Sequence, residues 1–281
     1  MIHGGFRAMG TTVEAWATSE ASWVDTRTLF ADVEAELSRF RPDSALSALN
    51  ENPNRHVSVT GRLAAALVAA ADVRDRTDGL VDAGVGAAVT AWGYDRTFTQ
   101  ISDLDSPPSG LTAPVWDIAD GVVTRPPGVA LDLGGIGKGW TADLAVEAGY
   151  AVVASAGGDI RSADPRAVVP VTGPDGDVVA TLAVGVGALA TSSTARRQWR
   201  VAGERVSHLI DPRTSRPVRS PVVSATVIAE TGVDAEAGAK AVLMLGVDGL
   251  AWASRQAWIR AAMVVWDTGS VYGTTGLRLA A

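Results

Sequence analysis

The chain has 281 residues, of which 24 are basic and 31 are acidic, so its formal net charge is −7. This acidic balance argues against a broad nucleic-acid interface, because phosphate binding depends on clusters of Lys and Arg. Hydrophobic residues make up 47% and charged residues 20%, which is typical of a globular protein rather than a disordered chain. The sequence contains no cysteine, which excludes disulfides, thiolate metal sites and cysteine nucleophiles.

Membrane spans and secretion signals are also absent from the sequence pattern. The longest apolar run, Leu63 to Ala71, has nine residues, whereas a membrane span needs about twenty. The first five residues contain no basic segment followed by an apolar stretch, so no secretory signal is visible. We therefore expect a cytoplasmic protein with no membrane span.

The first half of the chain alternates helical and extended patterns. Apolar residues at helical spacing, such as Leu29, Val33 and Leu37, predict a long helix, and Thr60 is placed to cap another. The expected elements are a strand at 7–17, helices at 21–40, 44–50 and 62–76, a hairpin at 115–124, a buried strand at 129–133 and a helix ending at 148. Residues 96–114 form the longest irregular stretch.

The second half is dominated by short strands. The expected strands are 150–155, 168–171, 178–185, 188–191, 199–201, 205–210, 222–229, 261–266 and one near 272, with helices at 234–245 and 250–258. Helices and strands mix without strict alternation. This order favours an α+β fold with mixed, largely antiparallel sheets and packed helices over a doubly wound sheet.

A glycine-rich loop after the predicted strand at 129–133 is the strongest local motif. The segment from Leu131 to Trp140 reads LDLGGIGKGW, so an acid ends a strand and three glycines precede a helix. Such a loop lets backbone N–H groups approach an anion closely, and Lys138 would add a positive charge. The alternative is a tight strand-to-helix turn whose lysine points into water. Lys138 and Lys240 are the only lysines among the 24 basic residues.

Three further segments carry weaker signals. Paired glycines precede Asp159, where the alternative is a plain turn or bulge. His208 and Asp211 lie before a proline turn, and a carboxylate can orient a proton-transferring histidine, although such a pair is more often structural. Asp234 is predicted to cap a helix, with Glu236 in its first turn. A carboxylate at a helix start can also bind Mg²⁺.

These segments, in this order, resemble the ApbE family of FAD:protein FMN transferases over nearly the whole chain. The resemblance covers six motifs: Met9-Gly10-Thr11, 40–50 (FRPDSALSALN), Asp82 through Trp92-Gly93-Tyr94, 131–139 (LDLGGIGKG), 156–159 (AGGD) with Thr191-Ser192, and 207–214 (SHLIDPRT).

The resemblance implies one domain over residues 1–281, related to the T-fold, with room for two subdomains and a cleft between them. It implies an enzyme that binds FAD with Mg²⁺, moves FMN onto a threonine hydroxyl of a target flavoprotein, and releases AMP. It further implies that certain residues contact the cofactor or the metal. These are Met9, Phe40, Asp82, Asp132, Lys138 and Leu209 for FAD, the carbonyl of Gly135 and the carboxylate of Asp234 for Mg²⁺, and His208 with Asp211 for activation of the hydroxyl.

Two departures from the family pattern leave other readings open. The family's metal helix places a threonine ligand four residues after its aspartate, where this chain has Gly238. A threonine near Asp82 is replaced by Gly84. The alternatives are an FAD-binding homologue with weak or no transferase activity, and an FAD hydrolase that gives FMN and AMP.

Overall fold

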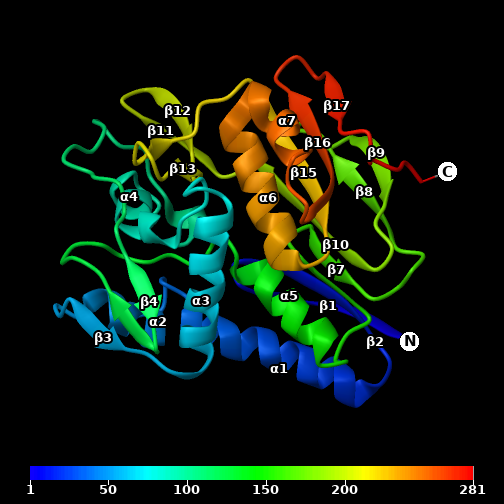
Figure 1. The fold of residues 1–281 in the computed structure, drawn as a ribbon, viewed down its shortest axis with the longest axis horizontal. Coiled ribbons are helices and arrows are strands. Elements are labelled where there is room, and N and C mark those ends of the chain that lie inside the picture. The colour runs from blue at the N-terminus through cyan, green and yellow to red at the C-terminus, as the bar shows by residue number, and fades with distance from the viewer. Residues whose placement is uncertain (281) are drawn as a thin grey trace. The chain divides into compact units, whose positions relative to one another are not determined.

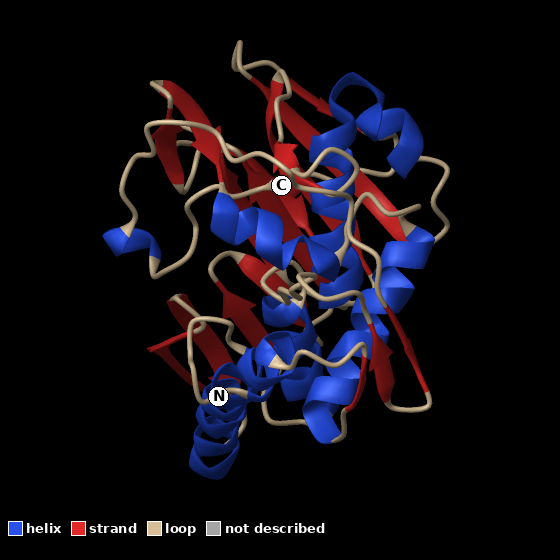
Figure 2. Cartoon of the chain, turned by 90° about the vertical axis from the view of Figure 1, so that its left-hand side faces the viewer, coloured by secondary structure: helices blue, strands red, loops and turns tan. Residues whose placement is uncertain are grey.

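The computed structural model describes residues 1–280, and it divides the chain into two compact units. Unit 1 consists of residues 1–32, 136–193 and the segment from 220 onward, and unit 2 consists of residues 33–135 and 194–219. Helices and strands are mixed throughout the chain, as Figure 2 shows. The α+β prediction is therefore confirmed, whereas a cleft between two subdomains stays a prediction.

Unit 1 is built on one eight-stranded sheet in which every neighbouring pair of strands is antiparallel. Its strands, in spatial order, are β1 (Ile2–Ala8), β2 (Thr11–Ala17), β6 (Val153–Ala156), β7 (Asp159–Ser162), β10 (Gly187–Ser193), β15 (Val222–Ala229), β16 (Ile259–Trp266) and β17 (Val271–Gly273). Residues at alternate positions of these strands point to opposite faces of the sheet. Different elements cover the two faces.

Helices cover one face of the sheet. These are the first part of α1 (Glu20–Leu37), α5 (Gly137–Glu147) and α6 (Gly232–Leu245), followed by the short η3 (Gly246–Asp248) and α7 (Gly249–Ala253). Figure 1 shows α5 and α6 lying along the strands. The contact of α6 with the sheet consists of alanines, because Ala235 of α6 packs against Ala188 and Ala229 of the sheet. Small side chains let the helix axes approach the sheet closely.

A β-hairpin covers the opposite face of unit 1. Strands β8 (Val168–Thr172) and β9 (Val178–Ala183) pair with each other and pack onto the sheet. Leu182 of the hairpin contacts a cluster that includes Leu189, Ile228 and Met263, all buried. The segment after β17 then pairs its Leu279 with Leu182.

Unit 2 combines short helices with small sheets. Its elements are α2 (Ala45–Glu51), β3 (His56–Ser58), α3 (Gly61–Arg76), η1 (Ala83–Val85), α4 (Gly86–Ala91), η2 (Phe98–Gln100), β4 (Asp117–Ala119), β5 (Val122–Thr124), β11 (Gln198–Val201), β12 (Glu204–Ser207), β13 (Ile210–Asp211) and β14 (Arg216–Pro217). Ser44 caps α2 by accepting a hydrogen bond from the amide of Ser47. A buried cluster that includes Trp92, Trp199 and Val201 forms one core of this unit.

Most predicted elements are confirmed, but the prediction of a buried strand at 129–133 is wrong. This segment has no regular strand partner. Its polar backbone atoms are satisfied in another way, because Asn50 donates to the carbonyl of Leu131 at 2.9 Å and accepts from its amide at 2.8 Å. The amide of Asp132 donates to the carbonyl of Ala83. The strand at 7–17 is also divided in two by a turn at Met9 and Gly10.

The N-termini of α5 and α6 meet at two glycines. A Cβ added at Gly139 would lie 2.4 Å from the carbonyl oxygen of Gly232, and a Cβ at Gly232 would lie 2.6 Å from the carbonyl oxygen of Gly139. No side chain other than hydrogen fits this contact. The two helix starts are therefore in backbone-to-backbone contact.

We predict that Gly139→Ala lowers the unfolding free energy by at least about 2 kcal/mol, because the new methyl group meets backbone atoms that have no room to move. Urea unfolding would measure the change. Gly137→Ala is the matched control, because its nearest new contact is the flexible end of Met9 at 3.6 Å. Equal stability of the two variants would contradict the close approach.

Candidate functional site

Two tight turns lie side by side at one end of the unit 1 sheet. Met9 and Gly10 join β1 to β2 with φ values of 52° and 67°, and Gly157 and Gly158 join β6 to β7 with φ values of 66° and 97°. A Cβ at Gly157 would lie 2.7 Å from the Thr11 hydroxyl oxygen. A left-handed backbone is uncommon for methionine, and such strained positions cluster at functional sites. The side chain of Met9 reaches the start of α5 at Gly137.

The first turn of α6 is capped from two directions. Thr231 accepts a hydrogen bond from the amide of Asp234 at 3.1 Å. Asp143 of α5 accepts from the amides of Gly232 and Val233 at 2.7 and 3.0 Å. Thr231 is therefore the N-cap, and the prediction that Asp234 fills this position is wrong. Asp234 is instead a largely buried residue of the first turn.

Both lysines of the chain lie in one cluster with two buried carboxylates, which we call the lysine–carboxylate cluster. Lys138 Nζ is 2.6 Å from Asp159 Oδ2 and 2.5 Å from Glu236 Oε1, and Lys240 Nζ is 3.1 Å from the same Glu236 oxygen. Glu236 also accepts from the amide of Gly139 at 3.0 Å. Lys138 therefore does not point into water, and the cluster joins α5, α6 and β7.

Burial and neighbouring charges act against each other at all four groups of this cluster. Burial prevails at two of them, because it raises the pKa of Asp159 and lowers the pKa of Lys240. Burial opposes ionisation of Glu236, but the two ammonium groups outweigh it and lower its pKa. Burial likewise opposes the charge on Lys138, and the carboxylates of Asp159 and Glu236 outweigh it, so its pKa is raised. Burying one such charge alone is costly, whereas burying it beside an opposite charge is tolerated. We conclude that Lys138 and Glu236 are both ionised near neutral pH.

In unit 2, Arg39 fixes the carboxylate of Asp132. Arg39 Nε donates to Asp132 Oδ2 at 2.8 Å, and its Nη2 donates to the carbonyl of Tyr94 at 2.6 Å. The other oxygen of Asp132 accepts from the amide of Gly134 at 2.7 Å. The start of the glycine-rich loop is thus held in place by a buried arginine. Gly135, the expected carbonyl ligand of a metal, is the last residue of unit 2 in this loop.

Aromatic rings gather around Tyr94 in unit 2. Phe40, Trp199 and His208 have ring centroids 5.5, 6.1 and 6.1 Å from that of Tyr94. Phe40 is 41% exposed as a residue, and the Arg39 guanidinium lies 4.1 Å from the centroid of its ring. A partly exposed ring of this kind offers a stacking surface to a planar ligand. The structure thus brings Phe40 and His208, two of the predicted site residues, into one cluster.

Asp82 is held by a neighbouring tryptophan. Its Oδ1 accepts from the amide of Gly84 at 2.7 Å and from Trp116 Nε1 at 2.6 Å. A Cβ at Gly84 would lie 2.4 Å from Pro114 Cβ and 2.9 Å from Trp116 Cδ1. The space of the threonine expected here is therefore filled by Pro114 and Trp116.

Asp211 binds Arg213 through both carboxylate oxygens. Oδ1 accepts from the Arg213 amide and Nε at 2.9 and 3.0 Å, and Oδ2 accepts from Nη2 at 2.8 Å. Burial opposes the charge, but these bonds outweigh it and lower the pKa of Asp211. The carboxylate thus orients Arg213, and its expected action on His208 stays a prediction. Leu209 is buried, and its carbonyl accepts from the amide of Val218.

The residues around α6 do not fit the magnesium site that the resemblance implies. A Cβ at Gly238 would lie 2.9 Å from Val227 Cγ1, 3.2 Å from Ile259 Cδ1 and 3.3 Å from Trp258 Cζ3. Apolar side chains therefore fill the place of the expected threonine ligand. The carboxylates of Glu236 and Asp159 are neutralised by lysines, and residues 1–280 contain no group of three His, Asp or Glu side chains placed to hold a metal ion.

Sequence reasoning missed several of these residues. Arg39 gave no signal beyond its position next to the motif at 40–50, and Tyr94 was noted only as the last residue of the motif that begins at Asp82. Glu236 was expected in the first turn of a helix, where the helix dipole favours an acid, so its position gave no reason to expect an ion pair with a lysine. The signal that could have revealed the lysine–carboxylate cluster was the presence of lysine at only two places in an arginine-rich chain.

We predict that Asp143→Ala lowers the unfolding free energy by about 1–3 kcal/mol, because it leaves two buried amides at the start of α6 without an acceptor. Glu147→Ala is the matched control on the same helix, because Glu147 is exposed and its loss should change stability by less than about 0.5 kcal/mol. Denaturant unfolding measures both. A loss no larger than that of the control would contradict the capping role.

Comparison with known proteins identifies the family of this chain. Residues 9–263 match the ApbE family. FAD:protein FMN transferases of Rhodobacter capsulatus and Salmonella typhimurium are 32% and 31% identical over 74% and 75% of this chain, which covers 43% and 67% of theirs. The ApbE protein of Thermotoga maritima has a TM-score of 0.84 and 25% identity, covering 98% of this chain and 97% of its own. Since the family match extends over most of the sequence, the chain belongs to the ApbE family.

Proposed function

We propose that this protein binds FAD and transfers its FMN half to the hydroxyl of a threonine in a target flavoprotein, with release of AMP. The curated relatives in the comparison are FAD:protein FMN transferases. The observation that carries the proposal is the aromatic cluster of unit 2. In this cluster Phe40, which offers a partly exposed stacking surface, and His208 both contact the ring of Tyr94.

The chemistry is phosphoryl transfer within the FAD pyrophosphate. The threonine oxygen forms a bond to the phosphorus of the FMN half, the bond from this phosphorus to the bridging oxygen breaks, and AMP leaves with that oxygen. The hydroxyl proton passes to the imidazole of His208, which acts as the general base. Positive charge near the pyrophosphate stabilises the negative charge that develops on its oxygens.

The proposal keeps the binding roles that the resemblance implies. Asp132, tied to Arg39, would bind the cofactor, as would Asp82, Leu209 and the ring of Phe40. Met9, whose side chain reaches the start of α5, and Lys138 keep the cofactor contacts that the resemblance implies for them. Dependence on Mg²⁺, which the resemblance implies through Gly135 and Asp234, is not part of the proposal, because the residues around α6 do not fit that site.

A second candidate is an FAD-binding homologue with weak transferase activity. The filled positions at Gly84 and Gly238 favour it, because both remove a hydroxyl expected near the cofactor. An FAD hydrolase, with water in place of the threonine, is the third. Release of AMP from FAD alone identifies hydrolysis. A mass increase equal to FMN less one water on a threonine-containing peptide, and not on its alanine counterpart, identifies transfer.

We predict that His208→Ala reduces AMP release at least about 100-fold while FAD binding is retained, because the hydroxyl loses its base. Chromatography of AMP and quenching of flavin fluorescence measure the two quantities. His56→Ala is the matched control, because His56 is exposed and bonds to Thr124, and its activity should equal that of the wild type. Equal rates in the wild type and His208→Ala would contradict the assignment.

A further inference from the structure

We propose that the ammonium groups of Lys138 and Lys240 take the place of a divalent cation in this protein, so that FAD binding and AMP release do not require Mg²⁺. This inference rests on the proposed function for its substrate. It starts from the lysine–carboxylate cluster, where the only two lysines of the chain meet at one carboxylate oxygen of Glu236. An ammonium is a compact point charge, unlike the planar guanidinium used elsewhere in this sequence.

The position of the cluster on α6 supports the substitution. The resemblance expects an acid and, four residues later, a metal-binding threonine. Two pairs on α6 have this spacing, namely Asp234 with Gly238 and Glu236 with Lys240. The position of Gly238 faces the apolar side chains of Val227, Trp258 and Ile259, whereas Glu236 contacts the amide of Gly139 in the first turn of α5. Glu236 and Lys240 are therefore the pair on the side of α6 that faces the start of α5.

The charge balance gives the physical reason. Two carboxylates and two ammonium groups sum to zero, as two carboxylates and one divalent cation would. Adding Mg²⁺ to the cluster as it stands would place two uncompensated positive charges in a largely buried site, which is strongly unfavourable. The carboxylate oxygens that Mg²⁺ would need are already bound to lysine nitrogens at 2.5 to 3.1 Å.

Lys138 also retains a donor for the substrate. An ammonium has three N–H donors, and Asp159 and Glu236 take two. The Lys138 side chain is 19% exposed, against 2% for that of Glu236. The third donor is therefore available to a phosphate oxygen of FAD, where it would supply the positive charge that a metal supplies in other phosphoryl-transfer sites.

The test compares FAD binding and AMP release in excess EDTA and in millimolar MgCl₂. We expect wild-type values that agree within about twofold, because no cation is needed. Lys240→Thr removes one ammonium and places a hydroxyl four residues after Glu236. It should bind FAD at least about tenfold more tightly with Mg²⁺ than with EDTA. Lys240→Arg, which keeps the charge, is the matched control and should remain independent of Mg²⁺.

Titration calorimetry with MgCl₂ alone separates this inference from the proposed function. The wild type should show no Mg²⁺ binding, and Lys240→Thr should show it, whether or not FAD binds. Binding of Mg²⁺ to the wild type with a submillimolar dissociation constant would overturn the inference, as would loss of FAD binding in EDTA that MgCl₂ restores. Failure to bind FAD under either condition would overturn the proposed function instead. Thermal unfolding of each variant shows that the fold is retained.

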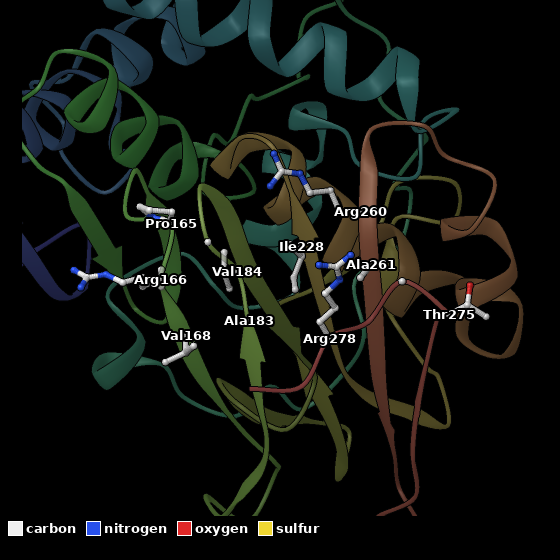
Figure 3. Close-up of a pocket in the computed structure, with 13 residues that line it drawn as sticks. Pro165, Arg166, Val168, Ala183, Val184, Ile228, Arg260, Ala261, Thr275 and Arg278 are labelled. Atoms are coloured by element: carbon white, nitrogen blue, oxygen red, sulfur yellow. The ribbon is translucent and has the colours of Figure 1, made fainter. Parts of the chain in front are cut away.

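A second inference comes from a cavity on the hairpin-covered side of the unit 1 sheet. The cavity has a volume of about 660 Å³, and thirteen residues line it, none of which belongs to the predicted site (Figure 3). Three of these residues are arginines, Arg166, Arg260 and Arg278, and none is acidic. Arg166 pairs with Asp164 at 3.4 Å, so Arg260 and Arg278 supply the positive charge of the cavity, on a chain whose net charge is −7.

The pairing of β15 with β16 is irregular at Arg260, and this irregularity sets the direction of the Arg260 side chain. The neighbours Ile228 and Ala229 pair with Ala261 and Ile259, so Arg260 is the extra residue of a β-bulge. Such bulges redirect a side chain, and here Arg260 Nη1 donates to the carbonyl of Val186 at 2.5 Å. Gly187 has a φ of 150°, and a Cβ there would lie 2.6 Å from Arg260 Nη1. The arginine is thus held in position before any ligand binds.

Apolar and charged groups share this cavity. Ile228 and Ala261 lie on the same side as Arg260 and Arg278, and the Arg278 side chain extends toward them, whereas Arg166 points away (Figure 3). No carboxylate of the described residues pairs with Arg260 or Arg278. We propose that the cavity binds a phosphate monoester with an apolar body, because a doubly charged phosphate matches the arginines better than a carboxylate does and the rest of the lining is largely aliphatic.

Phenyl phosphate is the probe for this cavity, with titration calorimetry as the measurement. We expect binding that weakens at least about tenfold in the double variant Arg260→Gln and Arg278→Gln, while FAD binding is unchanged. Arg255→Gln, an exposed arginine outside the cavity, is the matched control. Benzoate and inorganic phosphate should bind more weakly than phenyl phosphate. No binding, or equal binding by the double variant, would overturn the proposal.

Discussion

The ion pairs of Lys138 are the interaction on which unit 1 depends. They join a residue of α5 to acids on β7 and α6, at the point where Gly139 and Gly232 bring the two helices into backbone contact. Asp143 adds a second link, because it caps α6 from α5. Removing one charge would leave the others buried and uncompensated, which is far more costly than the absence of the whole cluster. The first turn of α5 is therefore held in a fixed geometry against β7 and α6.

In unit 2, the comparable constraint is the contact of Arg39 with Asp132 and Tyr94. One guanidinium binds a carboxylate of the loop and a carbonyl beside the aromatic cluster, so the loop and the rings keep a fixed relation to each other. Loop residues held by a rigid scaffold are the usual carriers of function. Unit 2 thus presents stacking rings and a fixed acid, and unit 1 presents a largely buried ammonium. The proposed function assigns these groups to the binding of a flavin dinucleotide.

The sequence predicted the fold class and the long helices well, because apolar spacing and caps are local signals. It placed a strand at 129–133 wrongly, because an apolar run does not show whether its amides bond to a strand or, as here, to the side chain of Asn50. Asp234 was misplaced as a cap because Thr231, three residues earlier, is equally suited to that role. The partnership of Lys138, Glu236 and Lys240 joins residues about one hundred positions apart, which no local pattern reports.

The most direct test of the central claim is NMR of the two lysine side chains in protein labelled with ¹⁵N-lysine. Because the chain has only two lysines, each Nζ signal is assigned by a single Lys→Arg variant. The account predicts two charged ammonium groups near neutral pH whose signals do not move when MgCl₂ is added, and a change at Lys138 when FAD binds. A neutral amine at Lys138, or displacement of both signals by Mg²⁺, would contradict it.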